Sequence, residues 1–180
     1  MKKNLLLFVF ILISNTIFSQ SYIGTITKQV NFRNEPSKTG ELLKILKQGS
    51  NIFIISIETE NDFYNIIDID SNTEGYVHKS FVKLGNVVAK SKNSVFTPNG
   101  KSSSYDSEVT IVNDTNRTLT LKLNEQYYNF KPYETKNLNL TPGLYDFRAS
   151  APGVIPYIGT ESLKSNEGYS WKFYITTRRS

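Results

Sequence analysis

Short apolar runs separated by turn residues fill the chain from Ile23 to Leu84. The run from Ile52 to Ile57 is rich in β-branched residues, and another run begins at Tyr64. Turn residues recur about every 8 to 12 positions, which is typical of small all-β barrels and sandwiches. No stretch keeps the period of about 3.6 residues that marks an amphipathic helix. The pattern predicts an all-β first domain over residues 22–84.

Alternation of apolar and polar residues becomes strict in the second half of the chain. Three sets alternate with polar neighbours: Leu119, Leu121 and Leu123; Tyr145, Phe147 and Ala149; and Tyr169, Trp171, Phe173 and Ile175. A period of two places each set on one face of a strand, so we expect half-buried antiparallel strands with one side in solvent. Turn residues such as Pro142 and Gly143 separate them. These features predict a second domain, an antiparallel β-sandwich, over residues 108–178.

The segment 85–107 between these two regions is rich in Lys, Asn, Ser, Pro and Gly. That composition predicts a linker. Val87, Val88, Val95 and Phe96 are too apolar for a wholly solvated segment, so we expect part of it to pack on a neighbouring domain. No internal repeat joins the two halves, which favours two different modules.

The first 19 residues have the layout of a secretory signal peptide. Lys2 and Lys3 precede the unbroken apolar run Leu5 to Ile13, and a stretch of small and polar residues follows. The alternative is a membrane anchor, but nine helical residues rise only about 14 Å against a hydrocarbon thickness of roughly 30 Å. We expect cleavage near Ser19, export to the periplasm or the cell exterior, and no membrane insertion after processing.

Charge and cysteine content narrow the partners and the chemistry. The formal net charge is +5, and the basic residues form no block of five or more, so we expect no nucleic-acid partner. The chain has no cysteine. Disulfides, thiolate metal sites, a cysteine nucleophile and the thiol that bacterial lipoproteins acylate are therefore absent, and each domain must be held by apolar burial.

Four motifs in order along the first domain resemble the bacterial SH3 (SH3b) family. They are Val30-Asn31-Phe32-Arg33-Asn34-Glu35-Pro36-Ser37, the segment from Gly40 to Gly49, Phe63-Tyr64-Asn65-Ile66, and Gly75-Tyr76-Val77-His78-Lys79-Ser80-Phe81-Val82. The resemblance implies a small SH3-like barrel. We expect seven apolar side chains inside it: Phe32, Leu43, Ile45, Phe53, Ile55, Ile66 and Val77.

The same resemblance implies binding of cell-wall peptide or glycan, or of a protein segment. The family often has tryptophan where this chain has Phe63 and Tyr76, so the stacking surface is smaller here. We expect a groove flanked by Tyr64 and Tyr76, with Phe63 and Arg33 completing the ligand-binding set. In the second domain, the stretch Leu140 to Phe147 resembles the hairpin of extracellular prealbumin or PEGA-type sandwiches, and Tyr127, Tyr133 and Tyr157 are candidates of lower rank.

No residue pattern points to catalysis, to a metal or to another cofactor. His78 is the single histidine, and its place in the strand predicts an outward, ordinary surface position. Asp68, Asp70 and Asn72 begin like a calcium loop, but Thr73 stands where that loop needs glycine, so we expect a solvated hairpin tip. No serine nucleophile motif is present.

We therefore expect an exported, non-enzymatic binding module without cofactors whose partner is peptidoglycan or an envelope protein or peptide. The alternative is an envelope structural or assembly protein in which both domains contact other proteins. An open groove beside the barrel aromatics favours the first reading, and a broad exposed apolar patch favours the second.

Overall fold

The computed structural model describes residues 20–176. The expected signal peptide, 1–19, and the last two residues of the predicted second domain lie outside this range. Strands account for nearly all the regular structure of the described residues, and the one helical turn is a 3-10 turn, Lys79–Phe81. The predicted all-β fold class, a small barrel followed by a β-sandwich, is confirmed. The sandwich is not wholly antiparallel as expected, because its strands Ser107–Asn113 and Glu167–Phe173 pair in parallel.

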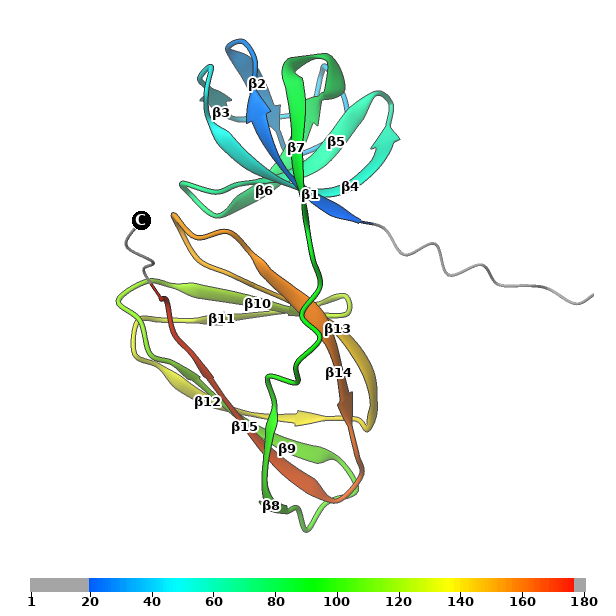
Figure 1. Ribbon diagram of the computed structural model, residues 1–180, viewed down its shortest axis with the longest axis vertical. Coiled ribbons are helices and arrows are strands. Elements are labelled where there is room, and N and C mark those ends of the chain that lie inside the picture. The colour runs from blue at the N-terminus through cyan, green and yellow to red at the C-terminus, as the bar shows by residue number, and fades with distance from the viewer. Residues whose placement is uncertain (1–19, 177–180) are drawn as a thin grey trace, which may run out of the picture.

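The first seven strands form a single sheet that curls around its own core (Figure 1). These strands are β1 (Ser21–Ile26), β2 (Val30–Arg33), β3 (Leu42–Leu46), β4 (Asn51–Glu60), β5 (Phe63–Asp68), β6 (Thr73–His78) and β7 (Val82–Val88). Their order across the sheet is β3-β2-β6-β5-β4-β1-β7, and all neighbours are antiparallel. Strands β3 and β7 are therefore the two edges.

The barrel core differs from the expected set in which residues of β3 and β4 it contains. The buried apolar residues of the barrel interior are Ile26, Phe32, Leu46, Ile52, Ile54, Ile66 and Val77. Leu43 and Ile45, expected inside, are 39% and 48% exposed because β3 is an edge strand. Phe53 and Ile55 were also expected inside, but they lie on the outer face of β4 and pack toward the second domain.

The β5–β6 turn also differs from expectation. Asp68, expected at a solvated hairpin tip, is 1% exposed. Its carboxylate forms an ion pair with Lys44 and accepts bonds from the amide and hydroxyl of Ser71. This aspartate therefore closes the turn and ties β3 to it.

The next eight strands form two packed four-stranded sheets. They are β8 (Thr97–Lys101), β9 (Ser107–Asn113), β10 (Leu119–Leu123), β11 (Gln126–Phe130), β12 (Thr135–Leu140), β13 (Gly143–Ser150), β14 (Tyr157–Leu163) and β15 (Glu167–Phe173). One sheet has the order β11-β10-β13-β14, and the other β12-β9-β15-β8. Leu119, Leu121 and Leu123 are buried between them, as their alternation predicts.

The segment 85–107, predicted as a linker, contains strand residues at both ends. Strand β7 continues to Val88, and β8 pairs with β15 at residues 97–101. Phe96 is 2% exposed and packs edge to face on Trp171, with ring centroids 5.6 Å apart. Only residues 89–96 connect the two regular structures, and in Figure 1 this green segment crosses the side of the sandwich before it enters β8.

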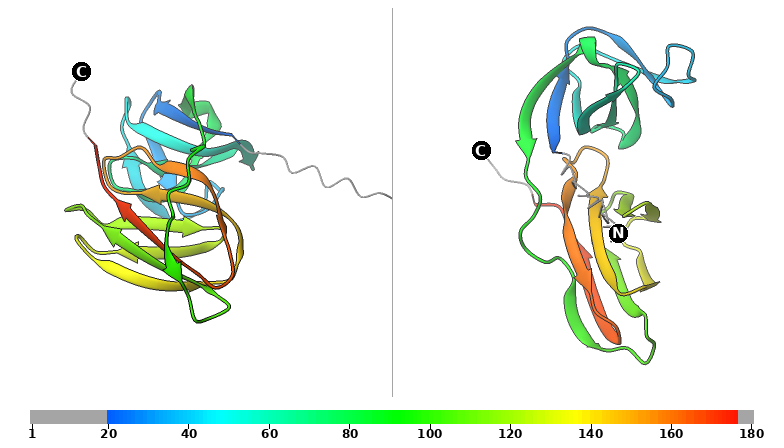
Figure 2. Two further views of the ribbon diagram at one scale, coloured as in Figure 1. Left: turned by 60° about the horizontal axis from the view of Figure 1, so that its bottom comes forward. Right: turned by 90° about the vertical axis from the view of Figure 1, so that its right-hand side faces the viewer.

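The barrel and the sandwich lie end to end, and apolar and charged contacts join them (Figure 2). Ile158 of the sandwich packs in one buried cluster with Phe53, Ile67 and Ile69 of the barrel. The Gly153 amide donates to the carbonyl of Ile69 at 2.7 Å. This continuity explains why the outer face of β4 is apolar.

A charged network lies beside this cluster. The Arg148 guanidinium, whose side chain is 10% exposed, forms an ion pair with Glu74 of the barrel. Glu74 also accepts a hydrogen bond from the Tyr127 hydroxyl at 3.2 Å and one from the Asn65 amide at 3.2 Å. One barrel carboxylate thus binds two residues of the sandwich.

Candidate functional site

The barrel carries a groove of about 440 Å³ on the side of the loop that joins β2 to β3. Its lining includes two cations, Arg33 and Lys38, which we call the cationic wall, and three ring residues, Phe63, His78 and Phe81, which we call the aromatic wall. Gln29, Val30 and Asn31 complete the lining. We call this the barrel groove.

The cationic wall comes from the end of β2 and the loop that follows it. Arg33 donates from Nη1 to the carbonyl of Gly40 at 2.5 Å, which holds the two ends of the loop together. Lys38 is exposed at the loop. Neither cation forms an ion pair with any residue between 20 and 176. Both positive charges are therefore available to an anionic ligand.

The aromatic wall is assembled by the β5–β6 pairing and the 3-10 turn after it. His78 pairs with Phe63 across the two strands, and their rings meet edge to face at 5.2 Å. The ring of Phe81 also meets the His78 ring edge to face, with centroids 6.1 Å apart. The His78 Nδ1 caps the turn by accepting from the Ser80 amide at 3.4 Å, and it lies 2.8 Å from the Ser80 hydroxyl. These contacts fix the imidazole in place, so the wall is pre-formed.

The structure does not bring the four predicted ligand residues together. Arg33 and Phe63 both line the barrel groove. Tyr64 pairs with Val77, whereas Tyr76 pairs with Asn65, so the two tyrosines belong to opposite faces of the β5–β6 pair. Tyr64 packs on the barrel core. The predicted groove flanked by both tyrosines is therefore wrong, because side chains one residue out of phase cannot share a face.

Tyr76 lies on the face that carries Glu74. Partial burial, followed by the negative charges of Glu60 and Glu74, raises the pKa of its phenol above the ordinary value. Tyr76 therefore belongs to the surroundings of the domain contact and is absent from the lining of the barrel groove.

Sequence reasoning missed Lys38, His78 and Phe81 in this groove. Lys38 lies directly after the SH3b-like motif that ends at Ser37, so this loop carries a usable sequence signal. His78, predicted as an ordinary surface residue, is half-buried and contacts two aromatic rings. Its position follows from the 3-10 turn that it caps.

The three lower-ranked tyrosines of the second domain have separate environments. Tyr127 binds Glu74 at the domain contact. Tyr133 is 68% exposed in a turn with a positive φ of 58°. Tyr157 lines a different groove, in the sandwich.

The barrel groove presents two positive charges, from Arg33 and Lys38, beside the rings of Phe63, His78 and Phe81. Its lining contains no carboxylate and no hydroxyl nucleophile. Across residues 20–176, no group of three or more His, Asp or Glu side chains is arranged to hold a metal ion. Within the same range, none of the helical structure is long and apolar enough to span a bilayer.

No protein-family model and no curated protein sequence matches the chain. Two solved structures are similar: NlpC2 and NlpC1 from Trichomonas vaginalis, each at 13% identity and a TM-score of 0.32. The matches cover 83% and 84% of this chain, but the chain spans only about half the length of each structure, 48% and 47%. Likeness at this level does not bear on function.

Proposed function

We propose that this protein is an exported, non-enzymatic binding protein whose barrel groove engages a carboxylate-bearing segment of the cell wall, or of a protein. The observation that carries the proposal is that a fixed aromatic wall lies beside two cations, Arg33 and Lys38, which form no ion pair with the described residues 20–176. The SH3b-like motifs of the first domain and the signal-peptide layout support the same reading.

The ligand chemistry follows from the two walls. A guanidinium presents a planar fork that matches a carboxylate, and a flexible lysine adds a second positive charge. The rings of Phe63, His78 and Phe81 offer apolar surface to the backbone or side chains of a bound segment. The peptide stems of peptidoglycan carry free carboxylates on short, flexible chains. A groove of about 440 Å³ accommodates a few residues of such a stem.

The test asks whether binding requires the negative charge of the ligand's carboxylates. A soluble stem tripeptide with free carboxylates is titrated into the processed protein by calorimetry, beside the same tripeptide with its carboxylates amidated. We expect saturable binding of the free acid and at least about a ten-fold weaker affinity for the amide. Equal binding of both peptides, or of neither, contradicts the proposal.

An assembly role is the second candidate, because one edge of the barrel is apolar. Leu42, Leu43 and Ile45 of edge strand β3 are 47%, 39% and 48% exposed. Edge strands are points where other chains add, although the register shift that β3 makes against β2 disturbs a regular edge. Crosslinking in intact cells tests this role. An Ile45→Lys variant that loses a wild-type crosslink supports assembly, and an unchanged crosslinking pattern opposes it.

A further inference from the structure

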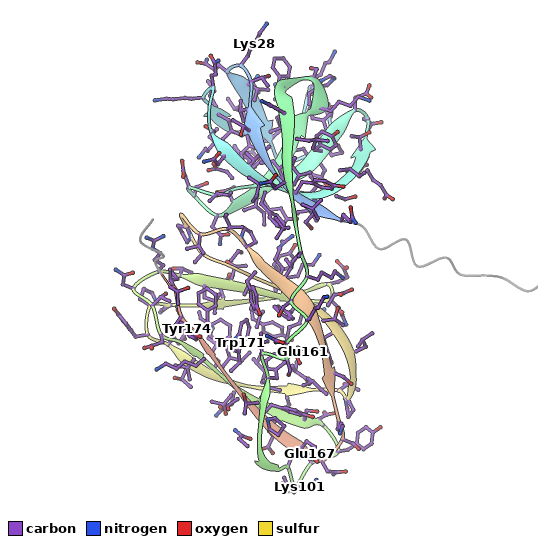
Figure 3. The ribbon with its side chains drawn as sticks, in the orientation of Figure 1. Lys28, Lys101, Glu161, Glu167, Trp171 and Tyr174 are labelled. Carbon is purple, nitrogen blue, oxygen red and sulfur yellow. The ribbon has the colours of Figure 1, made fainter. Side chains whose placement is uncertain are left out.

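The sandwich has its own groove, of about 700 Å³, along the C-terminal half of β15. Trp171 and Phe173 are largely buried in its floor, while Ile155, Tyr157 and Tyr174 stand exposed at its sides by 53%, 42% and 63%. Large apolar side chains rarely gather at the surface without a function. We call this the sandwich groove, and Figure 3 labels Trp171 and Tyr174 in it.

The groove exists because β8 stops short of the end of β15. On one side, β9 pairs with β15 as far as Phe173. On the other side, pairing with β8 ends where Ser170 meets Thr97. Among the strands of the described chain, residues 171–173 are therefore paired along one edge only, which leaves backbone groups at the groove.

A buried carboxylate holds the residues before β8 away from the unpaired edge of β15 at residues 171–173. Glu161 of β14 is 4% exposed, and no cation between residues 20 and 176 forms an ion pair with it. Its oxygens accept from the Ser94 hydroxyl at 2.8 Å and from the Val95 amide. An unpaired buried carboxylate is unfavourable unless such bonds hold it. These bonds draw residues 94–95 toward β14, so that the chain does not extend β8 across the groove.

The exposed ring of Tyr157 is held at both ends. Its hydroxyl lies 2.6 Å from the Ser91 hydroxyl, and its ring packs on Phe147 with centroids 5.6 Å apart. A fixed ring loses little conformational entropy when a ligand stacks on it. The groove is therefore pre-organised on this side.

The polar part of the lining consists of hydroxyls without an unpaired charge. Ser94, Thr97, Ser170 and Thr176 contribute hydroxyls. The single charged residue of the lining, Lys172, forms an ion pair with Asp114 at 2.8 Å. Rings, hydroxyls and backbone groups suit a ligand that presents C–H faces and hydroxyls, which is the chemistry of a neutral sugar.

We propose that the sandwich groove binds a segment of neutral polysaccharide, with Tyr157 and Tyr174 stacking on sugar rings. This site is separate from the barrel groove and differs from it in charge. A carboxylate-bearing segment suits Arg33 and Lys38, whereas the sandwich groove offers no free cation among its lining residues.

The single tryptophan of the chain provides a direct assay, because Trp171 lies in the floor of this groove. The processed protein is titrated with cellohexaose, chitohexaose, maltohexaose and xylohexaose while tryptophan emission is followed. We expect a saturable change with at least one of the four. Replacing Tyr174 by alanine should weaken that binding roughly three- to ten-fold, the effect of one lost stacking ring. This side chain is 63% exposed, so the variant should fold.

Tyr105→Ala is the matched control, since this tyrosine of the same sandwich is 69% exposed and lies outside the groove lining. Its affinity should equal that of the wild type. An emission unchanged by all four sugars, or sugar binding that Tyr174→Ala leaves intact, overturns the proposal. A change produced only by an extended peptide of alternating threonine and valine also overturns it, because it makes the free edge of β15 a strand-addition site.

Discussion

Replacing Glu74 by glutamine should destabilise the joined pair of domains. The substitution keeps the shape of the side chain but removes the carboxylate that Arg148 binds. The Arg148 side chain is 10% exposed and its Nε already has no hydrogen-bond partner, so its charge would remain buried without compensation. Tyr127 and Asn65 would also lose a charged acceptor. The loss falls on both domains because the network joins them.

The expected size follows from burial. Removing one partner of a buried ion pair costs about 3 to 5 kcal/mol. The Glu74 side chain is 30% exposed, so solvent screens part of the effect, and we expect a loss of about 2 to 3 kcal/mol. For a chain of this length that corresponds to a fall in Tm of roughly 5 to 10 °C. Calorimetry should also show the barrel and sandwich transitions moving apart, because their coupling is weakened.

A double-mutant cycle separates the ion pair from other effects. Arg148→Met alone and Glu74→Gln alone should each destabilise, and the double variant should lose less than the sum of the two. Asp62→Asn, which removes the exposed ion pair with Lys79, is the control and should leave Tm unchanged. A Glu74→Gln protein that melts within about 1 °C of the wild type, or strict additivity in the cycle, refutes the reasoning.

Three further predictions concern packing, pH and the sandwich groove. A Cβ at Gly75 would lie 2.5 Å from the carbonyl oxygen of Arg33, so Gly75→Ala should cost about 1 to 3 kcal/mol in urea unfolding, and an unchanged midpoint would contradict this packing. The hydrogen bond from Lys90 lowers the pKa of Asp146 from 3.8, so its stabilising contribution is complete above that pH and is lost as pH falls through the lowered pKa. Lys90→Gln should therefore flatten the acid limb of a stability profile between pH 2 and 6, and a limb as steep as in the wild type argues against it. Glu161→Leu should release the chain before β8 and shift tryptophan emission to the red, whereas an unshifted spectrum would show that the carboxylate does not hold it.

The sequence predicts the sandwich strands well because their two faces differ. Leu119 and Leu121 alternate with polar residues that face outward, and a strand with one wet side must show that alternation. The same logic fails for the run from Ile52 to Ile57. One face of β4 is buried in the barrel and the other against the sandwich, so both faces are apolar and the pattern cannot tell them apart.

The lining of the barrel groove was only partly predictable, because strand phase and tertiary packing decide which side chains reach it. Arg33 and Phe63 were named from the family resemblance and do line the barrel groove. Tyr64 and Tyr76 are expected to flank a groove because tyrosine suits ligand stacking, but their phase along the paired strands puts them on opposite faces. His78 joins the groove through a 3-10 turn, a local feature with a weak sequence signal. Phe81 reaches the groove through tertiary packing, which leaves no recognisable spacing in the sequence.

The most direct test of the account is co-sedimentation of the processed protein with purified peptidoglycan, comparing the wild type with Lys38→Glu. Lys38 is exposed and lines the barrel groove. Lys38→Glu therefore replaces a positive charge that attracts a carboxylate ligand by a negative one, without disturbing the core. Lys47→Glu, at an exposed barrel position outside the groove lining, is the matched control. We predict that the wild type and Lys47→Glu sediment with the wall while Lys38→Glu stays largely in solution. Sedimentation of all three proteins alike, or of none, would contradict wall binding through the barrel groove.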